Sequence, residues 1–130
     1  MAELTSRAAT VTLSAELAHL SPSITANIAE MRRVAYNTGA VPSKYKLLTA
    51  VALSVTIRCE PCIRAYVEWA GKKGATKAEL VEFLNVAMTM QGCPGEEWSL
   101  KALAAFNELV EGTTSRTDSP AADGGCCTHS

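Results

Sequence analysis

Residues 44–64 have the sequence KYKLLTAVALSVTIRCEPCIR. Residues 44–57 favour a helix over a strand because of their length, although their β-branched side chains suit both. A helix that is apolar on nearly every face is buried by its neighbours, so we expect this one to be the central helix of the fold. The next helix is expected over residues 61–73, because Pro61 suits a first helical turn and Gly74 a stop.

Helical patterns continue on both sides of this stretch. Residues 11–20 favour a short helix that packs on a neighbour, and a stronger apolar repeat follows Pro22. Ser21 is expected to cap the free amides at the start of that second helix. Further along, Thr76-Lys77-Ala78-Glu79 has the spacing of a capping box, and Gly92-Cys93-Pro94-Gly95 separates its helix from a last one ending near Glu111.

These elements predict an all-α fold, a compact and oligomeric bundle of about five to six helices, with residues 1–112 as one helical domain. From residue 113 the composition changes to Thr, Ser, Asp, Pro, Ala and Gly. Such a segment buries too little apolar surface to offset its ordering entropy. Residues 113–130 are therefore predicted to be a flexible tail that contains Cys126-Cys127-Thr128-His129.

The composition limits the partners that the chain can have. The net charge is −1, from 12 basic and 13 acidic residues, and no basic stripe is interleaved with aromatics, so nucleic acid is not an expected partner. The longest mostly apolar run, residues 47–57, is far shorter than the roughly 20 residues that span a bilayer, so no membrane partner is expected either. The first residues lack the pattern of a signal peptide, which predicts a cytoplasmic protein.

The pair Cys59-Glu60-Pro61-Cys62 has the strongest chemical signal in the chain. Positions i and i+3 share a helix face, so the two sulfurs can bond with little backbone movement. Unpaired amides at a helix start, together with Arg58 and Arg64, stabilise a thiolate and lower its pKa. The alternatives are half of a zinc site, which lacks a second ligand pair downstream, and two inert core cysteines. Placement at a helix start favours a reactive dithiol over both.

The run Lys46 to Leu109 resembles the carboxymuconolactone decarboxylase-like, alkylhydroperoxidase-D-like superfamily. The similarity lies in the buried helix that leads into Cys59-Glu60-Pro61-Cys62, in Gly74-Ala75-Thr76-Lys77-Ala78-Glu79-Leu80, and in the Gly92-x-Pro94 break before an Ala-rich helix. The resemblance implies an all-α fold that assembles with itself as a homotrimer or homohexamer, with its sites near subunit contacts.

In the thiol branch of that superfamily, the resemblance implies an enzyme, either a peroxidase with peroxiredoxin-like, antioxidant activity or a disulfide reductase. It assigns Cys62 as the cysteine that attacks peroxide and Cys59 as the one that resolves the sulfenic acid to a disulfide. The implied partners are a peroxide or disulfide substrate and an unidentified thiol reductant, and no cofactor or metal is expected. The decarboxylase branch lacks the cysteine pair, so lactone chemistry is not expected.

Two positions depart from the pattern of the superfamily. Its redox motif has a histidine four residues after the second cysteine, where this chain has Tyr66, and a glutamate twelve residues before the first, where it has Leu47. Those two groups form the proton relay that activates the attacking thiol. A phenol with a pKa near 10 is a poor base at neutral pH. The departures imply weak peroxidase turnover or another use of the dithiol.

Three further cysteines add sulfur to the chain. Cys93 stands where relatives have glycine, and is interpreted either as a third sulfur ligand or redox partner, or as a small apolar residue in a turn. Cys126, Cys127 and His129 have three possible roles. They bind a soft metal or metalloid, they exchange thiols with the Cys59–Cys62 disulfide, or they are an unconstrained terminus without a function.

The sequence thus leaves three hypotheses. The first is a thiol–disulfide oxidoreductase that cycles Cys59 and Cys62. The second is a binding protein that holds a soft metal or metalloid through the same pair and the extra cysteines. The third is a non-catalytic oligomeric relative.

Overall fold

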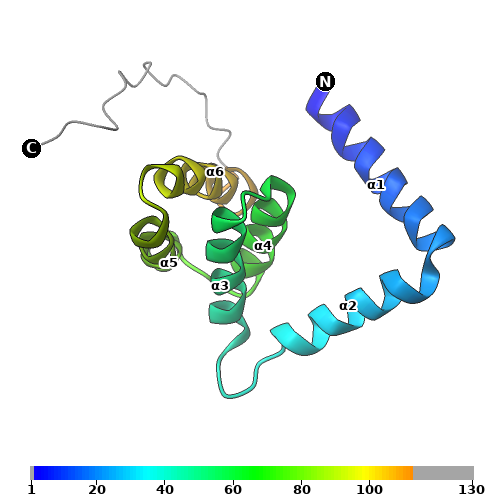
Figure 1. Ribbon diagram of the computed structural model, residues 1–130, viewed down its shortest axis with the longest axis horizontal. Coiled ribbons are helices and arrows are strands. Elements are labelled where there is room, and N and C mark those ends of the chain that lie inside the picture. Colours follow the sequence, from blue (N-terminus) through cyan, green and yellow to red (C-terminus); the bar gives the residue numbers. More distant parts are fainter. Residues whose placement is uncertain (1, 113–130) are drawn as a thin grey trace, which may run out of the picture. The chain divides into compact units, whose positions relative to one another are not determined.

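The computed structural model describes residues 2–112, which contain six α-helices and no β-strand (Figure 1). The predicted all-α class is therefore confirmed for this part of the chain. The described chain divides after Asn37 into two compact units, a helix pair and a four-helix unit. The predicted boundaries, one helical domain over residues 1–112 and a tail over 113–130, stay predictions, and the tail lies outside the described residues.

The first unit is a helix pair, α1 (Ala2–Leu20) and α2 (Pro22–Tyr36), joined at Ser21. The predicted short helix over residues 11–20 was too short, because the polar and small residues before it continue the same helix. Pro22 occupies the first turn of α2 as predicted, but the Ser21 side chain makes no capping hydrogen bond. The Ser21 amide instead donates to the Leu17 carbonyl at 2.8 Å, which continues the hydrogen bonding of α1 into the turn.

The apolar repeat of α2 is exposed in the single chain. No residue of α2 is buried, and its large apolar side chains are at least one-third exposed, as are several of α1. These side chains are, in α1, Val11, Leu13, Leu17 and Leu20, and in α2, Ile24, Ile28, Met31 and Val34. A repeat of this kind is typical of a packed helix face, so the pair has apolar surface to offer a partner.

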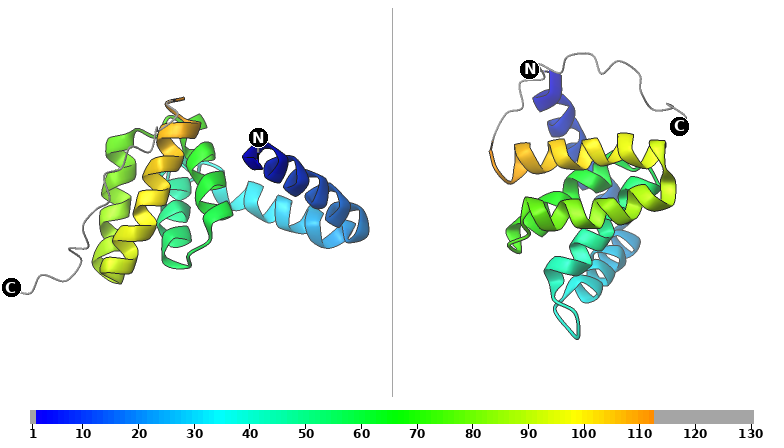
Figure 2. Two further views of the ribbon diagram at one scale, coloured as in Figure 1. Left: turned by 90° about the horizontal axis from the view of Figure 1, so that it is seen from above. Right: turned by 90° about the vertical axis from the view of Figure 1, so that its left-hand side faces the viewer.

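The second unit consists of α3 (Ser43–Thr56), α4 (Glu60–Lys72), α5 (Lys77–Gln91) and α6 (Cys93–Leu109). Helix α3 contacts α4, α5 and α6 and holds more buried residues than any of them, which confirms the prediction that it is the central, most buried helix (Figure 1). Helices α5 and α6 pack side by side against the α3–α4 pair (Figure 2). The largest fully buried side chains form the core between them: Leu48, Val51, Val55, Ile63, Val67 and Leu80.

Two ion pairs define which ends of the helices meet. Lys44 and Glu79 join the first turns of α3 and α5 at 2.9 Å, and Lys77 joins the start of α5 to Glu111, just beyond α6, at 2.7 Å. The start of α5 therefore lies beside both the start of α3 and the end of α6.

Local signals place the ends of α5 as the sequence predicts. The Thr76 hydroxyl accepts from the Glu79 amide while the Glu79 carboxylate accepts from the Thr76 amide, both at 3.1 Å, so the predicted capping box is confirmed. At the other end Gly92 has φ +64, a left-handed conformation that suits glycine, and α6 starts at once with Cys93. No helix within residues 2–112 is long and apolar enough to cross a membrane.

Candidate functional site

The turn between α3 and α4 ends one helix and starts the next within three residues. The Arg58 amide donates to the Val55 carbonyl at 3.2 Å and the Cys59 amide to the Ser54 carbonyl at 3.0 Å. These two bonds, with Arg58 at φ +56, form a Schellman motif in which arginine occupies the left-handed position that glycine usually takes. The motif terminates α3 and makes Cys59 the N-cap of α4.

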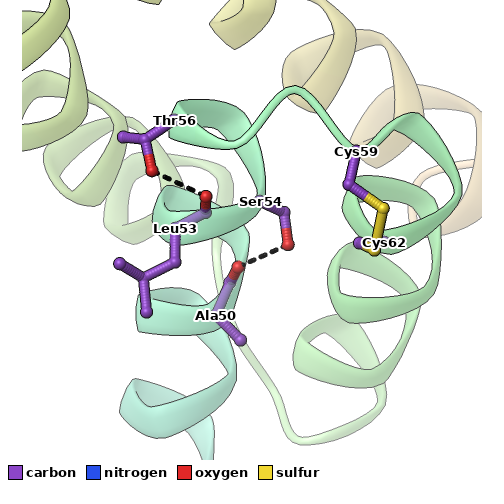
Figure 3. The surroundings of a disulfide bond; sticks show 6 residues. All are labelled: Ala50, Leu53, Ser54, Thr56, Cys59 and Cys62. Carbon is purple, nitrogen blue, oxygen red and sulfur yellow. Dashed lines mark hydrogen bonds between the residues drawn. A yellow bond between two sulfur atoms is a disulfide. The ribbon is translucent and has the colours of Figure 1, made fainter.

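Cys59 and Cys62 form a disulfide, with their Cα atoms 5.2 Å apart (Figure 3). Cys59 has extended backbone angles, so it lies just outside the helix, while Cys62 lies in the first turn of α4. Both residues are half-buried. The predicted approach of the two sulfurs is confirmed, although it arises from an N-cap and a first-turn residue rather than from two residues within one helix. The disulfide is therefore partly open to solvent, at a position that the backbone fixes.

The backbone beneath the disulfide is anchored in the core. The Ile63 amide donates to the Cys59 carbonyl at 2.9 Å, and the Ile63 side chain is fully buried. On α3, the buried Ser54 hydroxyl donates to the Ala50 carbonyl at 2.7 Å (Figure 3). This bond fixes the Ser54 side chain at the end of the helix that leads to Cys59. The backbone around the two sulfurs is therefore held by hydrogen bonds as well as by the disulfide.

The charges around the dithiol are paired with α6. Arg64 donates two hydrogen bonds to the Glu108 carboxylate, at 2.8 and 3.0 Å, and Lys101 lies 3.4 Å from a Glu60 oxygen. The Arg64 charge is therefore largely neutralised, which weakens its predicted effect on the thiols. The free amides at the start of α4 and the Arg58 guanidinium next to Cys59 remain as sources of positive potential at the sulfurs. Sequence reasoning missed both pairs, because they join residues more than forty positions apart.

The two positions of the expected proton relay hold no base. Leu47 is a core residue of α3, only 3% exposed. Tyr66 is half-buried on α4, and its ring packs edge-on against the Trp69 ring with centroids 5.2 Å apart. Within residues 38–112, the described part of the four-helix unit, there is no histidine, since His19 lies on α1. The described part of that unit therefore supplies no imidazole to the dithiol.

Cys93 begins α6 and is exposed. It is also disulfide-bonded. Its two interpretations, as a third sulfur ligand or redox partner and as a small apolar residue in a turn, stay predictions. Among residues 2–112, no group of three or more His, Cys, Asp or Glu side chains is arranged to hold a metal ion. Cys126, Cys127 and His129 lie outside the described residues.

Comparison with known proteins places the chain in a family. The model of the carboxymuconolactone decarboxylase family matches residues 22–105, which is more than half of the chain, so the chain belongs to this family. The resemblance stated from the sequence is thereby confirmed. The match covers α2 and nearly all of the four-helix unit.

Three relatives show the extent of the similarity. An uncharacterized protein of Cupriavidus necator is 36% identical over 77 residues, 59% of this chain and 68% of the relative. A protein of Paracoccus denitrificans, described as uncharacterized protein 4 in the cox locus, is 32% identical over 79 residues, 61% of this chain and 71% of the relative. The crystal structure of the apo form of a carboxymuconolactone decarboxylase family protein from Legionella pneumophila superposes with a TM-score of 0.75, at 32% identity, over 80% of this chain and 92% of that one.

Proposed function

We propose that this chain is a thiol–disulfide oxidoreductase that cycles Cys59 and Cys62 between disulfide and dithiol. The observation that carries the proposal is the disulfide between the N-cap and the first turn of α4, half-buried and within reach of solvent. A structural disulfide is rare in the cytoplasm, the location predicted from the sequence, whereas a cycling one is expected there because cellular thiols re-reduce it.

The chemistry of the cycle balances with a peroxide or a disulfide as the oxidant. With a peroxide, the Cys62 thiolate takes one oxygen and releases an alcohol or water, and the Cys59 thiol then displaces water from the sulfenic acid to close the disulfide. With a disulfide substrate, the same thiolate attacks one sulfur, and Cys59 resolves the mixed disulfide. In both cases two equivalents of a thiol reductant reopen the pair.

The surroundings of the pair favour the disulfide substrate. Leu47 has no group that exchanges a proton, and a phenol at Tyr66 replaces the expected imidazole. Peroxide attack needs both a thiolate and proton delivery to the leaving oxygen. Exchange with a disulfide needs only the thiolate, which the amides at the start of α4 stabilise. We therefore infer disulfide exchange as the main reaction and peroxide reduction as a slow one.

One experiment separates these reactions. The reduced chain is mixed with a small disulfide or with hydrogen peroxide, and closure of the Cys59–Cys62 disulfide is followed by mass. Closure should be fast with the disulfide and slow with the peroxide, and should be lost in Cys62→Ser. Tyr66→His should raise the peroxide rate about 10- to 100-fold by restoring a base, whereas the matched control Tyr66→Phe should not. A dithiol that closes with neither oxidant would refute the proposal.

The same proposal includes self-association, for which the exposed apolar faces of α1 and α2 provide a surface. The resemblance implies a homotrimer or homohexamer. Light scattering of the purified chain measures the mass of the assembly directly. Changing Ile24 and Met31 to lysine should shift it towards the monomer, while the exposed but polar Ser23→Lys control should leave it unchanged. A monomer in the unchanged chain would contradict this part of the proposal.

A further inference from the structure

Arg58 carries a charge beside the redox pair that has no partner within residues 2–112. Its guanidinium makes no hydrogen bond or ion pair in this part of the chain, and the residue is exposed. The two other charged residues of segment 57–64, Glu60 and Arg64, are each paired with a residue of α6. The segment that contains both cysteines therefore presents one uncompensated cation to the solvent.

The backbone conformation of Arg58 is unusual for an arginine. Its φ of +56 lies in the left-handed region, which glycine adopts freely and other residues adopt at a cost in free energy. Glycine would complete the same Schellman motif, since the two hydrogen bonds that close it are donated by backbone amides. Strained conformations of this kind cluster at functional sites. The turn itself therefore does not account for the guanidinium.

The immediate neighbours of Arg58 place this cation beside a reactive sulfur. Cys59 follows it directly and is the half-buried N-cap of α4. Ile57 precedes it, and this apolar side chain is 68% exposed and offers no counter-charge. A guanidinium binds a carboxylate through two parallel hydrogen bonds, which fix both the position and the orientation of the bound group. A single carboxylate on an incoming molecule is the ligand that this single cation fits.

Resting on the proposed function, we propose that the substrate is a small disulfide with a carboxylate a few bonds from its sulfur atoms, and that Arg58 binds this carboxylate. The Cys62 thiolate attacks one sulfur of the bound substrate, whose S–S bond breaks and releases one half as a thiolate. The Cys59 thiolate then attacks the Cys62 sulfur and releases the other half. The substrate disulfide is reduced to two thiols while the dithiol is oxidised to a disulfide, and the two protons of the dithiol go to the released thiolates. Arg58 selects the substrate and takes no part in the electron transfer.

Three small disulfides of similar size test the proposal. Dithiodipropionate carries two carboxylates, hydroxyethyl disulfide is uncharged, and cystamine carries two ammonium groups. The reduced chain is mixed with each at about 0.1 M ionic strength, where exposed charges more than about 10 Å apart are largely screened. Closure of the Cys59–Cys62 disulfide is followed by the mass of the peptide that contains both cysteines. Each rate is divided by the rate with hydroxyethyl disulfide, which removes any effect of a substitution on the thiols themselves.

Two variants remove the charge of Arg58. Arg58→Gly suits the left-handed turn, and it should lower the relative rate with dithiodipropionate about two- to fivefold and raise that with cystamine. Arg58→Gln keeps most of the length of the side chain and should show the same changes, because both variants lose the charge. The matched control is Lys73→Gln, which removes an exposed cation about 20 Å along α4 from Cys59 and should change neither relative rate.

The outcomes separate this proposal from the proposed function. Relative rates that are unchanged in either Arg58 variant, or that change equally in Lys73→Gln, would overturn the assignment of Arg58 while the closing dithiol still supports a redox cycle. A dithiol that closes with none of the three disulfides would instead refute the proposed function itself.

Discussion

Reduction of the Cys59–Cys62 disulfide is a perturbation whose energetic effect follows from the structure. The two cysteines are three positions apart, so the disulfide closes a loop of four residues. The chain-entropy relation gives such a loop about 6 cal/mol/K, or about 2 kcal/mol of stability at room temperature. The Ile63 amide donates to the backbone carbonyl of Cys59 and not to a sulfur, so we expect this anchor to persist when the disulfide is reduced. We therefore expect the dithiol form to stay folded and to lose only about 2 kcal/mol.

The assay is urea unfolding of one protein in its two oxidation states. A chain with Cys93→Ser, Cys126→Ser and Cys127→Ser retains only the pair Cys59 and Cys62, so that reductant changes a single bond. With an m-value of about 2 kcal/mol/M, the midpoint should fall by about 1 M on reduction. The control is the same chain with Cys59→Ser and Cys62→Ser, whose midpoint should not respond to reductant.

The result that would refute this reasoning is unfolding of the dithiol form without urea, or a midpoint loss of about 2.5 M or more. Either would show that the disulfide is a structural staple. A cycling pair could not have that role, because each turn of the cycle passes through the dithiol.

Further predictions concern the residues that position the site. A Cβ on Gly71 would overlap a Val110 methyl group. Gly71→Ala should therefore lower the unfolding free energy by a net amount of about 1–2 kcal/mol, even though alanine has the higher helix propensity. Adding Val110→Ala to this variant should remove most of the loss. Arg58→Gly should raise the unfolding free energy by about 0.5–1 kcal/mol, because arginine occupies a left-handed position there. The hydrogen bond from Lys44 is the main cause that lowers the pKa of Glu79 below its ordinary 4.5. The ionised Glu79 carboxylate therefore stabilises the fold above about pH 4.5, and this stabilisation is lost as the pH falls through the lowered pKa. Glu79→Gln should therefore flatten the pH dependence of the urea midpoint below about pH 5.

These predictions fail in distinct ways. A loss at Gly71→Ala that is unchanged by Val110→Ala would show that the overlap is not its cause. Destabilisation by Arg58→Gly would show that the arginine side chain, rather than the backbone conformation, is what the turn needs. If the urea midpoint of Glu79→Gln falls with pH below about pH 5 as steeply as that of the unchanged chain, the ion pair does not contribute to the pH dependence.

Local features of the fold could be predicted from the sequence because their causes lie within a few residues. The Thr76–Glu79 capping box, the break at Gly92 and the central position of α3 follow from spacing and hydrophobicity. The full length of α1 and the exposed apolar face of α2 did not follow, because helix propensity sets no sharp start and a periodic pattern does not say what covers it.

The candidate site could be predicted only in part. The spacing of Cys59 and Cys62 predicts that they can bond, and the structure confirms the bond. The left-handed Arg58 could not be predicted, because arginine is an uncommon residue at that position of a Schellman motif. The contacts of Arg64 with Glu108 and of Glu60 with Lys101 depend on how α4 meets α6, which local patterns do not contain.

The measurement that tests the central claim most directly is the mass of residues 59–64 through one complete cycle. The chain is reduced, treated with one equivalent of a small disulfide, and reduced again, with the free thiols blocked before each digestion. The account predicts two blocked thiols, then none with two hydrogen atoms lost, and then two again, in a chain that stays helical throughout. Two blocked thiols at every stage, or a pair that closes only when the chain is unfolded, would contradict the assignment of Cys59 and Cys62 as a redox-cycling pair.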